Sequence, residues 1–519
     1  MRIIDHLDKG ASLDPDRALL VADDVVITHA EGQARSHAVA AGLRAAGMRA
    51  GDTVGILAPN GPDGLLAMFG VWRAGGVLAP LNPYNALDAT RQFLVTTGCR
   101  WLFLHSTFAD AAATLLEDVP SLELVVCLDR PFDGGLAMDE LLAAGVSVDL
   151  GDGSDPTGGA DQVCVYWPTG GTTGRSKAVV WTNAVFARLL ETASRHWPAR
   201  GEMVNLAVAP MTHAAGVMAV LYAALGATIV VRQRFDADDV LDQIEAHRVT
   251  HLFLPPTAYY DLCRAQRERP RDCGSLDMLL LSAAPVSPER LGEGVELFGP
   301  CVAQSWGQAE APFLLTFLTP EDVAEAAAGT RPERLASCGR ATFSSLVAVM
   351  GPDGALLPPG ERGELVARGA LVTPGYLDRE QDTREMRRSG WHHTGDVGFI
   401  DEGGYVYVVD RLKDMIITGG FNVYAAEVES ALLALPEVGT CAVVGVPDER
   451  WGEAVVAFVV AADQREVDPA RLIAATRTRL GSVKAPKRVH VVAELPHTPV
   501  GKIDKRAVRD RLAPTALGA

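Results

Sequence analysis

A stretch rich in glycine and threonine, set between two strand-like runs, constrains the fold of this chain most. It extends from Pro168 to Lys177 and reads Pro-Thr-Gly-Gly-Thr-Thr-Gly-Arg-Ser-Lys. The runs beside it, 163–167 and 178–182, have the β-branched and aromatic content of strands. Glycine lets backbone N–H groups face a ligand, threonine adds hydroxyl donors and lysine adds charge, and all three features suit a polyphosphate. The alternative interpretation is a surface hairpin rich in turn residues.

This stretch is not the usual P-loop. That motif has glycine directly before its lysine, serine or threonine directly after it, and then a helix. Here Ser176 precedes Lys177, Ala178 follows it, and a strand-like run comes next. The sequence therefore predicts a different kind of phosphate-binding loop on a different fold.

Composition narrows the class of protein further. A chain of 519 residues that is 48% hydrophobic supplies a large core and more than one domain. The formal net charge of −18 argues against nucleic acid and anionic membranes as partners. No apolar run approaches the roughly 20 residues that cross a bilayer, and Met1–His6 does not resemble a signal peptide. Eight scattered cysteines without a CxxC pair favour reduced thiols and a cytoplasmic protein.

Strand-like and helix-like patterns alternate along most of the chain. The helix-like run 63–74, for example, is followed by the strand-like run 77–81. Such alternation predicts an α/β fold with mainly parallel sheets of βαβ type, in which ligands bind at the carboxyl ends of strands. Short strands and tight turns predict a small β subdomain at about 346–410. We expect an N-terminal domain at 1–410 and a smaller, mobile α+β domain at 411–519.

The glycine-rich stretch is one of several motifs that together resemble a known superfamily. The others lie at Gln304–Glu310, Thr394–Asp396, Asp410–Asp414 and Pro499–Ile503. Their order and spacing resemble the adenylate-forming superfamily from about residue 20 to residue 510, nearest to its acyl-CoA synthetase and aryl-acid CoA ligase branch. The resemblance implies that ATP and Mg²⁺ are used to convert a small-molecule carboxylic acid to an acyl-adenylate, which coenzyme A then converts to a thioester. We expect a monomer or homodimer.

The resemblance also implies which residues hold the phosphates and the metal. The β- and γ-phosphates of ATP would lie against the loop residues Thr169, Gly170, Gly171, Thr172, Thr173 and Gly174. Lys177 would add a cation there. Glu310 would bind Mg²⁺, a hard cation that takes carboxylate and phosphate oxygens.

The nucleoside would be held by three further segments. Trp306 would stack on adenine, with Ser305 and Gly307 beside it. The opposite side of the adenine would be flanked by Ala283, Ala284 and Pro285. Asp396 would accept both ribose hydroxyls, and Arg411 would reach ribose or phosphate.

The acid and the thiol complete the set of implied roles. Lys502 would bridge the carboxylate and the α-phosphate during adenylation; two anions react only when cations neutralise them and hold them in line. The acid pocket would include His213, Ala214, Gly216 and Gln308. The hinge and the thiol channel would include Lys413, Gly419 and Gly420.

Each of these assignments has a purely structural alternative. Lys502 is also compatible with a solvated lysine near a C-terminus, Trp306 with a core tryptophan, and Glu310 with a carboxylate at a helix start. His213 is also compatible with a buried structural histidine, and Gly419 with a simple turn.

Two alternative functions stay open at the level of sequence. An adenylating enzyme whose second step uses a carrier-protein thiol or a non-thiol nucleophile, such as a nitrite-using diazotase of an aryl amine, has nearly identical ATP motifs. A non-catalytic acyl sensor or scaffold on the same fold is the alternative from a different class. The complete set of implied ATP-site residues argues against the sensor.

The chain departs from the superfamily pattern at three positions. Ser176 and Ala178 stand where proline and glycine are usual, and Ala309 stands where threonine is usual. Aryl-acid activators of the superfamily also tolerate alanine at that last position, and they carry a glycine pair in the loop like Gly170-Gly171. Both features indicate an aromatic acid.

Overall fold

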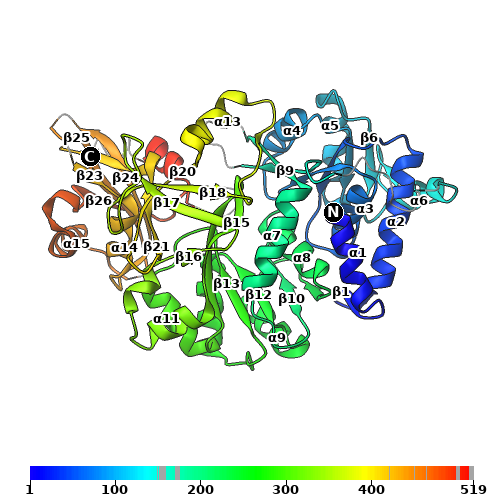
Figure 1. The fold of residues 1–519 in the computed structure, drawn as a ribbon. Helices are drawn as coiled ribbons and strands as arrows, with labels where there is room; N and C mark the ends of the chain where they lie inside the picture. Colours follow the sequence, from blue (N-terminus) through cyan, green and yellow to red (C-terminus); the bar gives the residue numbers. More distant parts are fainter. Residues whose placement is uncertain are drawn as a thin grey trace. The chain divides into compact units, whose positions relative to one another are not determined.

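Helices and strands alternate along the chain, which confirms the predicted α/β class (Figure 1). The computed structural model describes residues 1–148, 150, 159–169, 176–419, 421–448, 450–462, 465–497 and 503–512. The chain divides into two compact units, one of Met1–Val347 with Ala367–His392 and the other of Ala348–Val366 with His393–Ala519.

The larger sheet of the first unit has nine strands within the described residues and is parallel in its middle. In order across the sheet, the strands are β16 (Arg340–Ala341), β15 (Ala311–Leu318), β14 (Val302–Gln308), β13 (Met278–Leu281), β12 (His251–Leu254), β10 (Val204–Ala207), β11 (Thr228–Val231), β1 (Ala18–Ala22) and β2 (Val25–Thr28). The antiparallel strands β15, β16 and β2 lie at its two edges.

The second sheet of this unit has eight strands, again counted over the described residues. In order they are β19 (Gly375–Tyr376), β9 (Ala178–Thr182), β8 (Val163–Pro168), β4 (Val77–Leu81), β3 (Thr53–Leu57), β5 (Trp101–Leu104), β6 (Leu124–Cys127) and β7 (Leu136–Ala137). The pairs β8–β9 and β9–β19 are antiparallel, and the remaining pairs are parallel.

Helices connect the strands of both sheets. They are α1 (Ile3–Leu13), α2 (His29–Ala45), α3 (Pro62–Arg73), α4 (Leu87–Thr96), η1 (Ser106–Ala111), α5 (Ala112–Asp118), α6 (Met138–Gly145), α7 (Asn183–His196), α8 (Ala214–Ala224), α9 (Ala237–His247), α10 (Pro256–Glu268), α11 (Pro288–Phe298), α12 (Pro320–Ala327), η2 (Pro332–Ala336), α13 (Glu380–Met386) and η3 (Arg388–Gly390).

The core of the first unit joins the two sheets through α1, α7 and α8, and Figure 1 shows α7 and α8 between the strands. Helix α7 starts where it does because the side chain of Thr182 accepts a hydrogen bond from the backbone N–H of Val185. Helix α1 buries Ile3, Ile4 and Leu7, an apolar stripe with helical spacing. The stripe ties the start of the chain to both sheets.

The remaining strands form two smaller sheets. A four-stranded sheet has the order β17 (Ser345–Met350), β18 (Gly363–Gly369), β20 (His392–Ile400) and β21 (Val406–Arg411). A five-stranded sheet in the second unit contains β23 (Phe421–Val423), β22 (Ile416–Thr418), β25 (Gly452–Ala461), β24 (Val438–Asp448) and β26 (Arg488–Val491). The helical segments of this unit are η4 (Leu412–Asp414), α14 (Ala425–Leu433), α15 (Pro469–Lys484), α16 (Lys505–Ala507) and η5 (Val508–Leu512).

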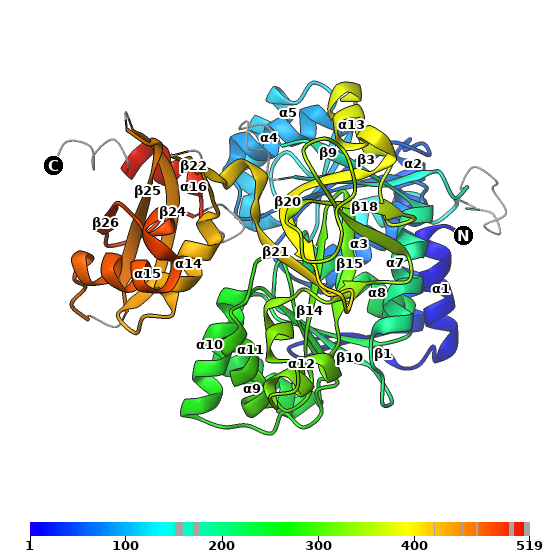
Figure 2. The same ribbon diagram turned by 60° about the vertical axis from the view of Figure 1, so that its left-hand side comes forward.

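Alternating valines along β24 and β25 bury both faces of the five-stranded sheet. On one face, Val443 packs in a cluster with residues of α14 and α15, which cover that face in Figure 2. On the other face, Val444 packs in a cluster with Leu495 and Val508. The last described segment of the chain is therefore part of the core of the second unit.

Two expectations about compartment can be compared with the structure. No helix in the described ranges is long and apolar enough to span a bilayer. All eight cysteines lie in the described part of the chain, and each is a buried free thiol.

Candidate active site

The glycine-rich stretch joins two antiparallel strands, β8 and β9, as the sequence predicts. The backbone N–H of Thr169 donates to the carbonyl of Lys177 at 3.0 Å, which closes the base of the loop. The hydroxyl of Ser176 donates to the carbonyl of Thr169 at 2.7 Å, a bond that the usual proline has no donor to make. The predicted phosphate-loop residues Gly170, Gly171, Thr172, Thr173 and Gly174 lie outside the described residues.

Lys177, at the end of this loop, contacts two side chains from the segment 375–386. Its Nζ lies 2.7 Å from Oδ1 of Asp382, on α13, and both side chains are 28% exposed. The same Nζ lies 4.9 Å from the centre of the Tyr376 ring, which is a cation–π distance. The ammonium group is thereby positioned at the base of the loop.

Tyr376 also contacts the predicted magnesium ligand. Its hydroxyl donates to Oε1 of Glu310 at 2.6 Å, and the backbone N–H of Thr373 donates to the carbonyl of Glu310 at 2.9 Å. Burial, together with the charge of Glu310, raises the pKa of Tyr376 well above its usual range, so this hydroxyl stays a donor. A carboxylate has lone pairs on both oxygens, so a cation can still bind Glu310 beside this bond.

Sequence reasoning missed Tyr376 and Asp382. Tyr376 lies 66 positions after Glu310 in the sequence, and Asp382 lies 205 positions after Lys177. The local signal was a Gly-Tyr pair followed by an acidic helix, and neither pattern points to a particular partner.

The segment Gln304–Glu310 lies mostly in a strand, because β14 ends at Gln308. Strand β14 continues to Gln308 because it pairs antiparallel with β15, with an irregularity between Trp306 and Gln308. Trp306 is half-buried and packs on a cluster that contains Leu315. A Cβ on Gly307 would lie 2.6 Å from the backbone nitrogen of Phe313, so this position requires glycine. Ser305 is buried in the same strand.

Gln308 and the loop after β13 are also fixed by hydrogen bonds. Oε1 of Gln308 lies 3.2 Å from Nε2 of His392. The hydroxyl of Ser282 donates to the carbonyl of Ser305 at 2.9 Å, and this bond ties the loop to β14. The next residue, Ala283, has a left-handed φ of 76°, a strained conformation for a residue with a side chain. The predicted adenine-flanking residues Ala283, Ala284 and Pro285 are all exposed.

Three of the predicted acid-pocket residues, His213, Ala214 and Gly216, lie at the start of α8, beside a cavity with an apolar lining. Nδ1 of His213 accepts a hydrogen bond from the N–H of Ala214, and the ring stands edge-on to Trp167 at 5.8 Å. Trp167 stacks on Trp181 at 5.1 Å, and both rings line the cavity. Gly216 lines it too, and a Cβ there would lie 1.6 Å from the carbonyl oxygen of Met211.

The predicted ribose and hinge residues lie in the second unit. Asp396 and Arg411 face each other across the β20–β21 pair, with Nε of Arg411 2.6 Å from Oδ1 of the nearly buried Asp396. Burial lowers the pKa of Lys413, which lies two residues beyond Arg411. Gly419 has a φ of 57° and donates its N–H to the carbonyl of Trp451. Gly420 and Lys502 lie outside the described residues.

The structure thus brings together two sets of predicted residues. In the first unit, Lys177 and Glu310 meet at Tyr376, and Trp181 extends from the acid cavity toward Glu310 because its indole N–H donates to the carbonyl of Ala309 at 2.8 Å. In the second unit, Asp396 and Arg411 form an ion pair.

Two family models match this chain. The family model for AMP-binding enzymes matches residues 7–377, and the model for the AMP-binding enzyme C-terminal domain matches residues 427–502. The chain is similar to feruloyl-CoA synthase of an Amycolatopsis species, with 37% identity over 510 residues and 97% of each chain covered. It is 36% identical over 528 residues to a medium/long-chain-fatty-acid–CoA ligase of Mycobacterium tuberculosis, covering 98% of this chain and 89% of the relative.

Among solved structures, the amide bond synthetase of Marinactinospora thermotolerans is similar with a TM-score of 0.87. It is 30% identical in sequence, and the match covers 98% of this chain and 99% of that chain. The chain belongs to the AMP-binding enzyme family. Within that family it is an AMP-forming acid–thiol ligase, which uses ATP to convert a carboxylic acid to an acyl-adenylate and then transfers the acyl group to coenzyme A.

Proposed function

We propose that the acid is apolar beyond its carboxylate, with an aromatic or aliphatic body and no second charge. The observation that carries this proposal is the cavity beside Trp167 and Trp181, since every side chain that lines it is apolar. Such a wall stabilises rings and chains through contact and burial, whereas a second carboxylate placed there would lose its hydration without gaining a partner. The similarity to feruloyl-CoA synthase and to a fatty-acid–CoA ligase supports both kinds of body.

The residues of the first unit also fit magnesium and the phosphates of ATP. Mg²⁺ is commonly held by one or two carboxylates together with substrate phosphates, and it neutralises phosphate charge when bound. Glu310 supplies one half-buried carboxylate, and the described residues contain no group of three or more metal-ligating side chains. We assign Glu310 to the metal and Lys177, with the loop 169–174, to the β- and γ-phosphates.

The remaining roles are proposed on the resemblance to the superfamily and, for Asp396 and Arg411, on their contact as well. Asp396 binds the ribose hydroxyls and Arg411 orients it, since the two form an ion pair across neighbouring strands. Trp306 and Ala283 bound the adenine site. Lys502 acts in adenylation, and the segment 411–519 acts as the C-terminal domain after a hinge at Lys413. The protein is cytoplasmic, which its buried free thiols support, and is a monomer or homodimer.

An acid panel tests the proposed substrate class. We expect pyrophosphate release from ATP with aryl, cinnamyl or fatty acids, and formation of the matching thioester when coenzyme A is added. Each acid is paired with an analogue that carries a second carboxylate at its far end, for which kcat/KM is expected to be at least about 100-fold lower, because burying an unpaired charge costs several kcal/mol. Equal rates with the paired diacids would contradict the proposal, and acyl transfer to an amine instead of coenzyme A would move the second step to another nucleophile.

Changing Tyr376 to phenylalanine tests its link to the metal site. The variant keeps the ring against Lys177 but loses the hydroxyl that donates to Glu310. We expect the Mg²⁺ concentration needed for half-maximal pyrophosphate release to rise by about tenfold, as for other residues that orient metal ligands. Tyr259→Phe is the matched control, because its hydroxyl also donates a partly buried hydrogen bond, to the carbonyl of Arg290. An unchanged Mg²⁺ requirement in Tyr376→Phe would rule out the positioning role.

A further inference from the structure

The first turn of α1 forms part of the wall of the apolar cavity. Ile3 is 3% exposed, and its side chain lines the cavity together with Trp72 and Phe186. These three side chains come from α1, α3 and α7, and Trp181 and Gly216 line the same cavity. The cavity wall therefore includes both the start of the chain and Trp181, whose indole N–H donates to the carbonyl of Ala309 beside Glu310.

Hydrogen bonds hold this turn of α1 firmly against the cavity. The backbone N–H of Ile3 donates to Oδ1 of Asn183 at 3.0 Å in a buried contact. Asn183 is the first residue of α7 and comes two residues after Trp181, so α1 is tied to the same chain segment that forms the indole wall. The side chain of Arg2 is bonded to Asp5 and completes the cap.

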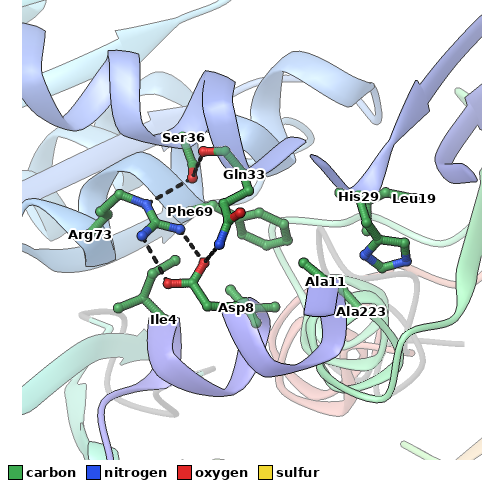
Figure 3. A pocket seen from close by; sticks show the side chains of 11 residues that line it. Ile4, Asp8, Ala11, Leu19, His29, Gln33, Ser36, Phe69, Arg73 and Ala223 are labelled. Carbon is green, nitrogen blue, oxygen red and sulfur yellow. Dashed lines mark hydrogen bonds and ion pairs between the residues drawn. The ribbon is translucent and has the colours of Figure 1, made fainter. Parts of the chain in front are cut away.

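The next turn of α1 is fixed through Asp8, as Figure 3 shows. Asp8 receives two hydrogen bonds from the guanidinium group of Arg73 and one from the amide of Gln33. Ile4 lines this second cavity, whereas Ile3 lines the apolar one. Neighbouring isoleucines on α1 thus face two different cavities.

We infer that Ile3 is a specificity-determining residue, whose side chain closes the far end of the acyl cavity and limits the length of the acids that the enzyme activates. This inference rests on the proposed apolar acid site. Because α1 is held by Asn183 and by Arg73, the wall cannot retreat, and the space available to the acid depends on the size of the side chain at position 3.

The experiment compares acids of increasing length in variants of neighbouring isoleucines. With Ile3→Ala, the ratio of kcat/KM for a longer acid to that for the best wild-type acid is expected to rise at least about tenfold, the discrimination that one methylene contributes in an apolar pocket. With Ile3→Phe, the preference is expected to move to shorter acids. Ile4→Ala removes an equally buried side chain, 1% exposed, and is expected to leave the ratio unchanged.

Each outcome is decisive. The inference is overturned if the ratio of kcat/KM for the longer acid to that for the best wild-type acid stays at the wild-type value in both Ile3 variants. It is also overturned if Ile4→Ala shifts this ratio equally, because such a shift would reflect general loosening of α1. Ile3→Val serves where the alanine variant does not fold, with a smaller shift expected in the same direction. If the wild-type enzyme activates no apolar acid at all, the proposed function fails, whereas wild-type activity with unchanged variants overturns only the role of Ile3.

Discussion

Replacing Lys502 with alanine is expected to lower acid-dependent pyrophosphate release by roughly 10²–10³-fold, the usual cost of removing one preorganised donor from a reaction centre. A carboxylate attacks the α-phosphate only when the negative charge on both is neutralised. Transfer of the acyl group from chemically prepared acyl-adenylate to coenzyme A needs no such attack, so its rate is expected to stay near the wild-type value.

The two half-reactions are measured separately, by pyrophosphate release and by thioester formation from the adenylate. Arg506→Ala is the matched control, because it removes an exposed cation four residues away. Equal losses in both half-reactions would contradict the assignment of Lys502 to adenylation and would indicate general damage to the C-terminal segment.

Replacing Lys505 with methionine is expected to destabilise the second unit by about 3–5 kcal/mol, because it leaves a buried carboxylate without its partner. Nζ of Lys505, on α16, lies 2.9 Å from Oε1 of Glu429, on α14, and the two side chains are 20% and 16% exposed. The double variant Lys505→Met/Glu429→Leu is expected to recover most of the loss, since it removes both charges. Urea unfolding of the three proteins measures the difference.

The same ion pair predicts how stability varies with pH. Burial opposes the charged form of Lys505, but the charges of Glu429 and Asp410 outweigh it, and the pKa of Lys505 is raised in the folded state. A raised pKa means that the stabilisation is fully present below the unfolded value of about 10.4 and is lost as the pH rises above it. The wild type is therefore expected to lose stability above about pH 10 more steeply than the double variant, and identical profiles would contradict this role of Lys505.

The parallel sheets were predictable because their strands are buried on both faces. Val77–Leu81 and Trp101–Leu104 are continuous apolar runs, and the strands observed have the same bounds. The extent of the strand around Trp306 is harder to predict, because its strand character comes from antiparallel pairing with β15 rather than from its own small and polar residues.

In the candidate site, too, features set by neighbouring residues could be predicted from the sequence, whereas contacts between distant residues could not. The hairpin at Thr169–Lys177 could be predicted from the sequence because glycine, threonine and lysine occur together between two strand-like runs. The contacts that position Lys177 and Glu310 come from Tyr376 and Asp382. These residues are far apart in the sequence, and the pairing of β19 with β9 brings their segments together. Hydrophobic periodicity carries no information about such pairs.

The buried thiols make this protein suited to site-selective labelling. Burial raises the pKa of Cys99 and Cys164 to about 12, so neither forms the reactive thiolate at neutral pH. All eight native cysteines are buried. A cysteine introduced at an exposed position of each compact unit will therefore react with maleimide probes while the native thiols stay unlabelled. Fluorescence energy transfer between two such probes follows the distance between the units through adenylation and thioester formation in the otherwise native enzyme.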